Sequence, residues 1–229
     1  MPFAAHTLTQ IDTPRPRILD LFCCGGGAGM GYRQAGFDVV GVDIMPQKRY
    51  PFPFIQADAL GLDMAFIRTF DAIHASPPCQ AYTLAQRIRG NEHPDLIDPT
   101  RELLEASGLP WVIENVEGAP LRNPIVLCGS MFPELRVYRH RQFEASFSIT
   151  VPEHLAHDVP LTKMGRPVVA GNFMHVVGNF SGVSAARKAM GIDWMARDEL
   201  REAIPPAYTR HIGTQLLAHV TSRILMAAE

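Results

Sequence analysis

A rigidly held thiol is the first chemically capable feature of this sequence. Cys79 directly follows two prolines within His74–Thr83, which reads HASPPCQAYT. Each proline fixes a backbone angle and lacks an N–H donor, so the thiol sits in a stiff turn. Such a thiol can serve as a nucleophile, as a metal ligand or as a small buried apolar residue. Reactivity needs both the thiolate form and access, so the cysteine alone leaves these three uses open.

Polar side chains further along the chain are candidates to act with this thiol. Glu114 and Asn115 close the apolar run WVIENV, and Arg139 and Arg141 lie in YRHRQFE. A carboxyl group can exchange a proton with a reacting base, and a guanidinium is a planar, permanently charged donor. Ligands of open α/β sheets bind at the carboxyl ends of the strands. We therefore expect the cysteine and the glutamate, which both follow apolar runs, at one edge of a sheet.

The glycine-rich stretch Asp20–Gly31, DLFCCGGGAGMG, indicates a turn between a strand and a helix that can bind a ligand. Glycine lets the backbone approach a ligand closely, and Asp43, at the end of the next apolar run, is placed to accept hydrogen bonds from ribose hydroxyls. The turn lacks the G-K-[ST] ending of a P-loop. Three alternatives remain open: a dinucleotide site, a site for S-adenosylmethionine, and a tight turn without a ligand.

Alternating strands and helices in the first half of the chain must position these residues. Strands are predicted over Arg17–Phe22, Asp38–Asp43, Phe54–Asp58, Asp71–Ser76 and Trp111–Val116. Helices are predicted within Ala28–Phe37, Asp63–Phe70 and Pro99–Gly108. This alternation predicts an α/β fold, a doubly wound and mostly parallel sheet with helices on both faces.

The second half is less regular until its last helix. From about residue 144, prolines and a lack of apolar periodicity predict a loop-rich region, with one or two strands in Val168–Gly182. Near the C-terminus, apolar residues recur every four positions and predict one face of an amphipathic helix. These residues are Ile212, Leu216, Val220 and Ile224, with Leu217 beside them.

The composition fits one globular domain and excludes a membrane span. The chain has 229 residues, 47% hydrophobic and 19% charged, with a formal net charge of −2. No run approaches the roughly 18 apolar residues that a span needs, and the first residues lack the layout of a signal peptide. We therefore expect a cytoplasmic protein with no membrane partner. A nucleic acid would have to bind local basic patches.

Seven motifs, in order, resemble those of the DNA (cytosine-5)-methyltransferases, particularly the short types of phages and their bacterial hosts. They read DLFCCGGGAGMGYRQAGF, GVDI, ADAL, SPPCQAYT, ENV, YRHRQFE and EAIPPAYTRHIG. The resemblance covers nearly the whole chain. Pro-Pro-Cys-Gln together with Glu-Asn-Val is specific, because amino-group DNA methyltransferases carry an aromatic residue after the two prolines. The resemblance implies a Rossmann-like class I methyltransferase fold, S-adenosylmethionine as cofactor and double-stranded DNA as partner.

The resemblance implies a role for each catalytic candidate. Cys79 is expected to add to carbon 6 of cytosine, so that carbon 5 can take a methyl group. Glu114 is expected to hydrogen-bond ring nitrogen 3. Arg141, supported by Arg139, is expected to contact the base carbonyl or hold the site. The target base must be flipped out of the duplex. The residues expected near DNA, in the loop after the cysteine, are Gln80, Arg87 and Arg89.

The resemblance also implies a cofactor pocket, in which Asp43 holds the ribose and Asp58 the adenine amino group. The residues expected to line it are Phe22, Gly25, Gly26, Gly27, Asp43, Ile44, Asp58, Ala59 and Pro78. Two positions depart from the family pattern. Cys24 stands where glycine is usual, and Glu202 stands where an asparagine commonly helps to hold the methionine end of the cofactor.

The domain division expected from the resemblance is simple. Residues 1–143 and 197–229 form the S-adenosylmethionine-dependent catalytic domain, and residues 144–196 form a very small target-recognition region. A monomer is expected. His154 and His157 form an H-x-x-H pair, but a metal needs three or four ligands and no second cluster of ligands is near, so no metal site is expected.

Two other functions remain open. One is the same chemistry on RNA, since a related branch of the family modifies tRNA. The other is a catalytically weak DNA-binding protein that uses the same fold. The sequence also leaves open whether the protein works in a restriction-modification or a phage modification system.

Overall fold

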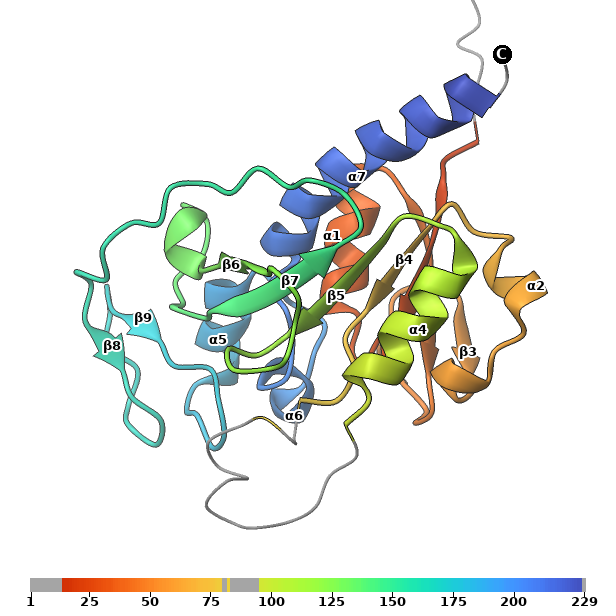
Figure 1. Ribbon diagram of the computed structural model, residues 1–229. Helices are drawn as coiled ribbons and strands as arrows, with labels where there is room; N and C mark the ends of the chain where they lie inside the picture. Colours follow the sequence, from red (N-terminus) through yellow and green to blue (C-terminus); the bar gives the residue numbers. More distant parts are fainter. Residues whose placement is uncertain (1–13, 80–81, 83–94, 228–229) are drawn as a thin grey trace, which may run out of the picture.

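A seven-stranded sheet forms the centre of the computed structural model, which describes residues 14–79, 82 and 95–227 (Figure 1). The strand order is β3-β2-β1-β4-β5-β7-β6. In this order the strands span Phe54–Gln56, Asp38–Asp43, Arg17–Leu21, Ala72–Ala75, Trp111–Asn115, Arg141–Ala145 and Ile125–Leu127. The strands β3 to β5 are parallel, and β7 runs antiparallel to both β5 and β6. The predicted doubly wound, mostly parallel fold is confirmed.

Helices cover both faces of the sheet, because each buried strand divides its side chains between two hydrophobic clusters. Alternate residues of a strand point to opposite faces. In β1, Ile18 joins the cluster of α1 and α7, and its neighbour Leu19 joins the cluster of α2 and α4. Figure 1 shows α4 in front of the sheet and α1 with α7 behind it. The helices are α1 (Gly27–Ala35), α2 (Met64–Ile67), α4 (Ile97–Ser107), α5 (Val183–Met190), α6 (Arg197–Leu200) and α7 (Pro206–Ala227).

The first and last helices approach each other closely. A Cβ atom added at Gly31 of α1 would lie 2.0 Å from Thr209 Oγ1 and 2.2 Å from the carbonyl oxygen of Pro206. The Thr209 hydroxyl donates a hydrogen bond to the carbonyl of Ala28 at 2.8 Å. Glycine is therefore needed here for backbone approach, and the last motif docks directly on the helix that the glycine turn opens.

The amphipathic face predicted for α7 is correct at three of the four residues that recur every four positions. Ile212, Leu216 and Val220 are buried, and Leu217 packs beside them. The prediction for Ile224 is wrong, since its side chain is 51% exposed. Figure 1 shows the last turns of α7 projecting beyond the sheet and beyond α1, the described elements that bury its earlier turns.

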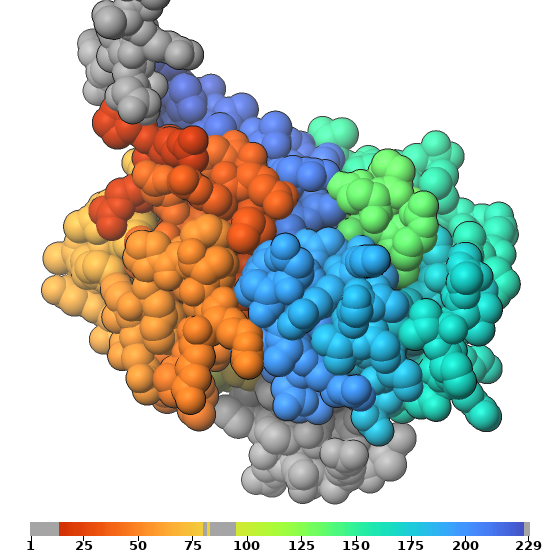
Figure 2. Space-filling view, turned by 180° about the vertical axis from the view of Figure 1, so that it is seen from behind, coloured from red at the N-terminus to blue at the C-terminus, as the bar shows by residue number. Residues whose placement is uncertain are grey.

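The region from residue 144 is loop-rich, as predicted, but contains elements that the sequence pattern did not reveal. Val168–Gly182 contributes one strand, β9 (Phe173–Met174), which pairs in parallel with β8 (Leu161–Thr162). The helix α5 was not predicted. Figure 2 shows the light-blue segment around residues 180–200 between the orange N-terminal part and the teal region around residue 150. Among the described residues, no helix has the length and apolar character to cross a membrane.

Candidate active site

Three adjacent strands carry the three main catalytic candidates. Cys79 follows the carboxyl end of β4, and Glu114 lies near the carboxyl end of the neighbouring β5. Arg141 begins β7, which pairs with β5 in the antiparallel sense, so the start of β7 lies beside the end of β5. The edge predicted for the cysteine and the glutamate is therefore formed, and the antiparallel strand brings the arginine to it.

Glu114 and Arg141 form a close, largely buried ion pair. The distance from Arg141 Nε to Glu114 Oε1 is 2.9 Å, and the side chains are 14% and 8% exposed, respectively. Arg141 also donates from a terminal guanidinium nitrogen to the carbonyl of His140 at 2.8 Å. Burial raises the pKa of the Glu114 carboxyl, and this outweighs the lowering effects of the Arg141 charge and a hydrogen bond from Ser76. The pair thus combines a carboxyl whose pKa is raised by burial with a fixed positive charge 2.9 Å away.

The Cys79 thiol lies within the electrostatic reach of this pair. Burial raises its pKa, the charge of Arg141 lowers it, and the charge of Glu114 raises it. The preceding turn is fixed from β5, because the side-chain amide of Asn115 donates to the carbonyl of Pro77 at 2.9 Å. The pKa of the half-buried thiol therefore lies above its ordinary value, and Arg141 is the group that opposes this rise and favours the thiolate form.

Arg139 is buried near this pair and joins three segments of the chain. Its guanidinium donates to the carbonyls of Val176 at 2.8 Å and Arg201 at 2.7 Å, and the hydroxyl of Tyr208 donates to the carbonyl of Arg139. Burial, followed by repulsion from Arg141, lowers the pKa of Arg139 to about 9. These contacts suit the supporting role expected for Arg139.

A buried network below Cys79 was missed by the sequence analysis. The hydroxyl of Tyr32 and Nδ1 of His74 are 3.0 Å apart, and Nε2 of His74 lies 2.8 Å from Ser76 Oγ. Burial lowers the pKa of His74 to about 3, so the ring is neutral at neutral pH. A single histidine within the otherwise apolar run of β4 is the sequence signal that could have revealed this network.

The glycine turn after β1 adopts a left-handed backbone at three positions. Phe22 has φ 56°, Cys24 has φ 43° and Gly26 has φ 81°. Asp43 fixes the turn, since its Oδ2 accepts from the backbone N–H of Cys24 at 3.0 Å and its Oδ1 accepts from that of Met45 at 2.8 Å. Each carboxylate oxygen has a second lone pair, so Asp43 can still accept hydrogen bonds from a ligand.

The remaining residues expected at the cofactor pocket lie on both sides of this turn. Ile44 follows Asp43 and is 65% exposed. Asp58 caps a short 3₁₀ helix by accepting from the N–H of Leu60 at 3.0 Å. Ala59 is buried in that helix and Pro78 is half-buried. The backbone of the turn is packed from behind, as seen at Gly25 and Gly27. The Trp194 indole donates to the carbonyl of Gly25 at 2.8 Å, and a Cβ on Gly27 would lie 2.3 Å from the carbonyl oxygen of Ile204.

Asp20, also missed by the sequence analysis, is a fully buried carboxyl group beneath the turn. Its Oδ2 accepts from the hydroxyl of Tyr50 at 3.0 Å, and its Oδ1 has no hydrogen-bond partner among the described residues. Burial is the main cause that raises the pKa of Asp20 to about 8, against the lowering effect of the Tyr50 hydrogen bond. Its place within an apolar strand run was the available signal.

The two departures from the family pattern lie at this site. The Cys24 side chain is exposed, but crowding by surrounding atoms of the turn, followed by the charges of Asp43 and Glu202, raises the pKa of its thiol. The charge of Glu202 also raises the pKa of Cys79. The charge of Glu202 thus acts on both thiols, while its carboxylate lies 3.7 Å from Arg201 Nε.

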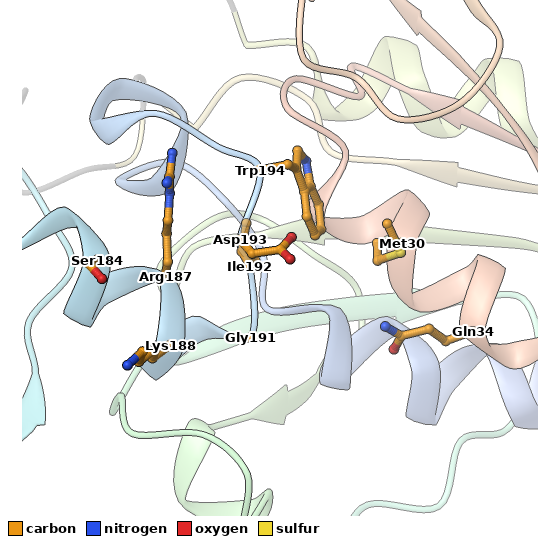
Figure 3. Close-up of a pocket in the computed structure, with 9 residues that line it drawn as sticks. All are labelled: Met30, Gln34, Ser184, Arg187, Lys188, Gly191, Ile192, Asp193 and Trp194. Carbon is orange, nitrogen blue, oxygen red and sulfur yellow. The ribbon is translucent and has the colours of Figure 1, made fainter.

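The residues expected near DNA, which are Gln80, Arg87 and Arg89, fall outside the described residues. A groove of about 570 Å³ lies between α1 and α5, and it is lined by Met30 and Gln34 of α1 and by Arg187 and Lys188 of α5 (Figure 3). None of the predicted catalytic or cofactor residues lines this groove, so it is separate from the site at the strand ends.

The expectation that no second cluster lies near the H-x-x-H pair is wrong in three dimensions. Ligand atoms of Cys128 and His140 lie within 4.8 Å of those of His154 and His157, and of one another. Cys128 and His140 are distant from His154 and His157 in the sequence. The pairing of strands β6 and β7 brings Cys128 and His140 close to each other.

Comparisons with known proteins find methyltransferases in sequence and in fold. No family model matches the chain. Over 147 residues, 56% of this chain, it is 30% identical to the type II methyltransferase M.XorII of Xanthomonas oryzae pv. oryzae, and the match spans only 31% of that protein. Over 118 residues, 46% of this chain, it is 33% identical to the type II methyltransferase M.HgiGI of Herpetosiphon aurantiacus, and this match spans 94% of that protein.

Solved structures share the fold. A prophage-encoded E. coli protein, described as a DNA modification methyltransferase, superposes with a TM-score of 0.66 at 14% identity, covering 90% of this chain and 99% of the other. The S. pombe Dnmt2 methyltransferase gives a TM-score of 0.60 at 13% identity, with the same coverage. The relatives in sequence and the ordered motifs show that the chain belongs to the type II methyltransferase family, as a short member of the DNA (cytosine-5)-methyltransferase type.

Proposed function

We propose that this protein transfers a methyl group from S-adenosylmethionine to carbon 5 of cytosine in DNA, through a covalent bond between Cys79 and the base. The observation that carries the proposal is the convergence of a thiol, a carboxyl and a guanidinium at one sheet edge. Arg141 Nε lies 2.9 Å from Glu114 Oε1, and both charges act on Cys79. These are the groups needed to activate a base that is itself a poor nucleophile.

The reaction follows from the roles of these side chains. The Cys79 thiolate adds to carbon 6 of cytosine, and the electron pair of the 5,6 double bond becomes available at carbon 5. Glu114, whose raised pKa favours the protonated carboxyl, donates a hydrogen bond to ring nitrogen 3 as negative charge develops there. Arg141 holds that carboxyl and offers donors to the base carbonyl. After methylation, a base, which we take to be water, removes the proton from carbon 5, and the thiolate leaves as the double bond re-forms.

The residues of the glycine turn suit S-adenosylmethionine, which would supply an electrophilic methyl group on a sulfonium. Asp43 retains acceptor capacity for the ribose hydroxyls, and the exposed Ile44 offers an apolar surface for the adenine ring. Asp58 would accept from the adenine amino group. Glu202 would attract the ammonium of the methionine end, which is opposite in charge. The other contacts proposed are Phe22, Gly25, Gly26, Gly27, Ala59 and Pro78.

Double-stranded DNA is the proposed substrate, and residues 144–196 are the proposed target-recognition region. DNA is the substrate class of the family to which the chain belongs. A region of this size has room for few base contacts, so we propose that it reads a short target sequence. Addition of the thiolate to carbon 6 needs access to the face of the ring, which stacking in the duplex blocks, so the cytosine must be flipped out of the duplex.

Methyl transfer from labelled S-adenosylmethionine tests the proposal. Purified protein is offered cytosine-rich duplex DNA and, separately, tRNA, with Cys79→Ser and, as a control at an exposed position, Glu105→Ala. We expect 5-methylcytosine in DNA with the wild type and Glu105→Ala, and none with Cys79→Ser. Label in tRNA alone would show that the substrate is RNA and not DNA, and the proposed mechanism would stand. Cofactor binding without label in either nucleic acid would favour a binding protein and contradict the proposal.

A further inference from the structure

The cluster of Cys128, His140, His154 and His157, called here the Cys-His cluster, lies outside the proposed active site. Each of its members offers one ligand atom, and all four atoms lie within 4.8 Å of one another. Cys128 directly follows β6, and His140 directly precedes β7. The two other histidines lie in the segment 151–160, which has no regular secondary structure. Three separate parts of the chain thus converge on one point.

We propose that the Cys-His cluster binds one Zn²⁺ ion in a closed, structural site. Zinc bonds of about 2.0–2.3 Å place tetrahedral ligand atoms about 3.3–3.7 Å apart. Cys128 Sγ lies 3.3 Å from His157 Nε2, and His140 Nε2 lies 3.2 Å from His154 Nε2. Two opposite edges of the cluster therefore have nearly the separation that a tetrahedron requires. Small adjustments of exposed side chains complete it.

The type of ligands selects the metal. Three imidazoles and one thiolate suit Zn²⁺, whereas Ca²⁺ and Mg²⁺ need oxygen ligands. Four protein ligands leave no open position for water or substrate, so the site is structural. On binding, the Cys128 thiol loses its proton to solvent and the three rings donate neutral nitrogen lone pairs. The metal and its ligands then carry a net charge of +1, one thiolate against the two positive charges of the ion.

The surroundings of the cluster orient its ligands. Nδ1 of His140 lies 3.9 Å from Glu117 Oε2, the arrangement in which a ligand ring faces a carboxylate through its other nitrogen. The ring of His157 stacks on Tyr138 with centroids 3.8 Å apart. The hydroxyl of Ser130 donates to Cys128 Sγ at 3.3 Å. The stack restrains the plane of the His157 ring and the Ser130 hydroxyl orients the thiol, while the carboxylate of Glu117 lies near the free nitrogen of His140.

The position of the site gives the metal a structural task. The ion would clip the irregular segment 151–160 to the ends of β6 and β7. His140 lies between Arg139 and Arg141 in sequence, so ligation would also restrain the backbone that presents both arginines. The zinc site does not depend on the proposed reaction, because none of its ligands belongs to the proposed catalytic set.

Metal analysis tests the site directly. The protein is prepared without a polyhistidine tag, stripped with a chelator, given one equivalent of Zn²⁺ and desalted. We expect about one zinc per chain by elemental analysis. Replacement by Co²⁺ should give the visible bands of a tetrahedral site together with a thiolate-to-metal charge-transfer band. Wild-type protein that retains no zinc, or a cobalt spectrum without tetrahedral bands, would overturn the proposal.

Variants identify the ligands. Loss of a group that only orients a metal ligand typically lowers metal affinity ~10–100-fold, and this is the loss of zinc affinity expected for Glu117→Gln. Cys128→Ser and His157→Gln each remove a proposed ligand, so their zinc affinity should fall by more than this. Cys24→Ser and His219→Gln, a thiol and an imidazole outside the cluster, should keep the full zinc content. His154→Gln alters an exposed side chain, so it should fold, and its circular dichroism checks this. Zinc retained at wild-type affinity by both His154→Gln and His157→Gln would contradict the assignment.

Discussion

A buried ion pair between α4 and β7 should govern the stability of the strand that presents Arg141. Arg101 Nε and a terminal nitrogen each lie 2.8 Å from one oxygen of Glu144, and the two side chains are 2% and 6% exposed. Glu144 Oε2 also accepts from the backbone N–H of Arg122 at 2.8 Å. The perturbation is Glu144→Ala. It leaves a buried guanidinium without its main partner and a backbone donor without its acceptor.

The expected cost is large. Removing one partner of a buried ion pair costs about 3–5 kcal/mol of unfolding free energy. Arg101 keeps contacts with the carboxylate of Asp98 and the carbonyl of Pro120, so we expect the lower end, about 3 kcal/mol. For a chain of this size each kcal/mol shifts Tm by about 2–4 °C, which gives a fall of about 6–12 °C. Urea titration followed by circular dichroism measures the free energy, and thermal melting measures Tm.

A matched control comes from the same helix. Glu105 forms an exposed pair with Arg122 at 3.4 Å, with side chains 53% and 65% exposed. Glu105→Ala should therefore cost at most about 1 kcal/mol. The double change Arg101→Met with Glu144→Leu should recover much of the loss, since apolar pairs often replace buried ion pairs without cost. A cost for Glu144→Ala equal to that for Glu105→Ala would refute the reasoning.

Three further predictions concern pH and packing. The folded state holds a proton on Asp20 up to about pH 8, whereas the unfolded chain releases it near pH 4. Stability should therefore fall between these values, and urea titrations across this range should show a weaker fall for Asp20→Asn. Arg141 lowers the pKa of Cys79, so Arg141→Gln should move the pH midpoint of Cys79 alkylation to a higher value. Peptide mass spectrometry follows the alkylation, and an unchanged or lower midpoint would count against the effect of Arg141 on the thiol. Gly31→Ala would place its Cβ 2.0 Å from Thr209 Oγ1 and should cost at least about 1–3 kcal/mol in urea unfolding. Gly61→Ala, with its nearest contact at 3.8 Å, should be near neutral, and equal costs for both would disprove the close approach of α1 and α7.

The sequence by itself determined the centre of the fold and the proposed catalytic set. Strands buried on both faces appear as short apolar runs, and all five predicted strands are present. Gly36 ends α1 with φ 114° and Gly108 ends α4 with φ 72°, as their positions after each helix predicted. Cys79 and Glu114 each follow or close such a run. The rule that parallel strands end at one edge was therefore enough to expect them together.

Tertiary structure decided what depends on contacts between distant segments. The polar strand β7, RQFEA, shows little apolar pattern, and only its pairing with β5 reveals that Arg141 meets Glu114. The burial of Asp20 and His74 depends on helices that cover the sheet, since a strand pattern does not say which polar residue finds a partner there. The Cys-His cluster needs two strand ends and an irregular segment to meet, and local sequence carries no information on that meeting because its ligands interact only after the chain has folded.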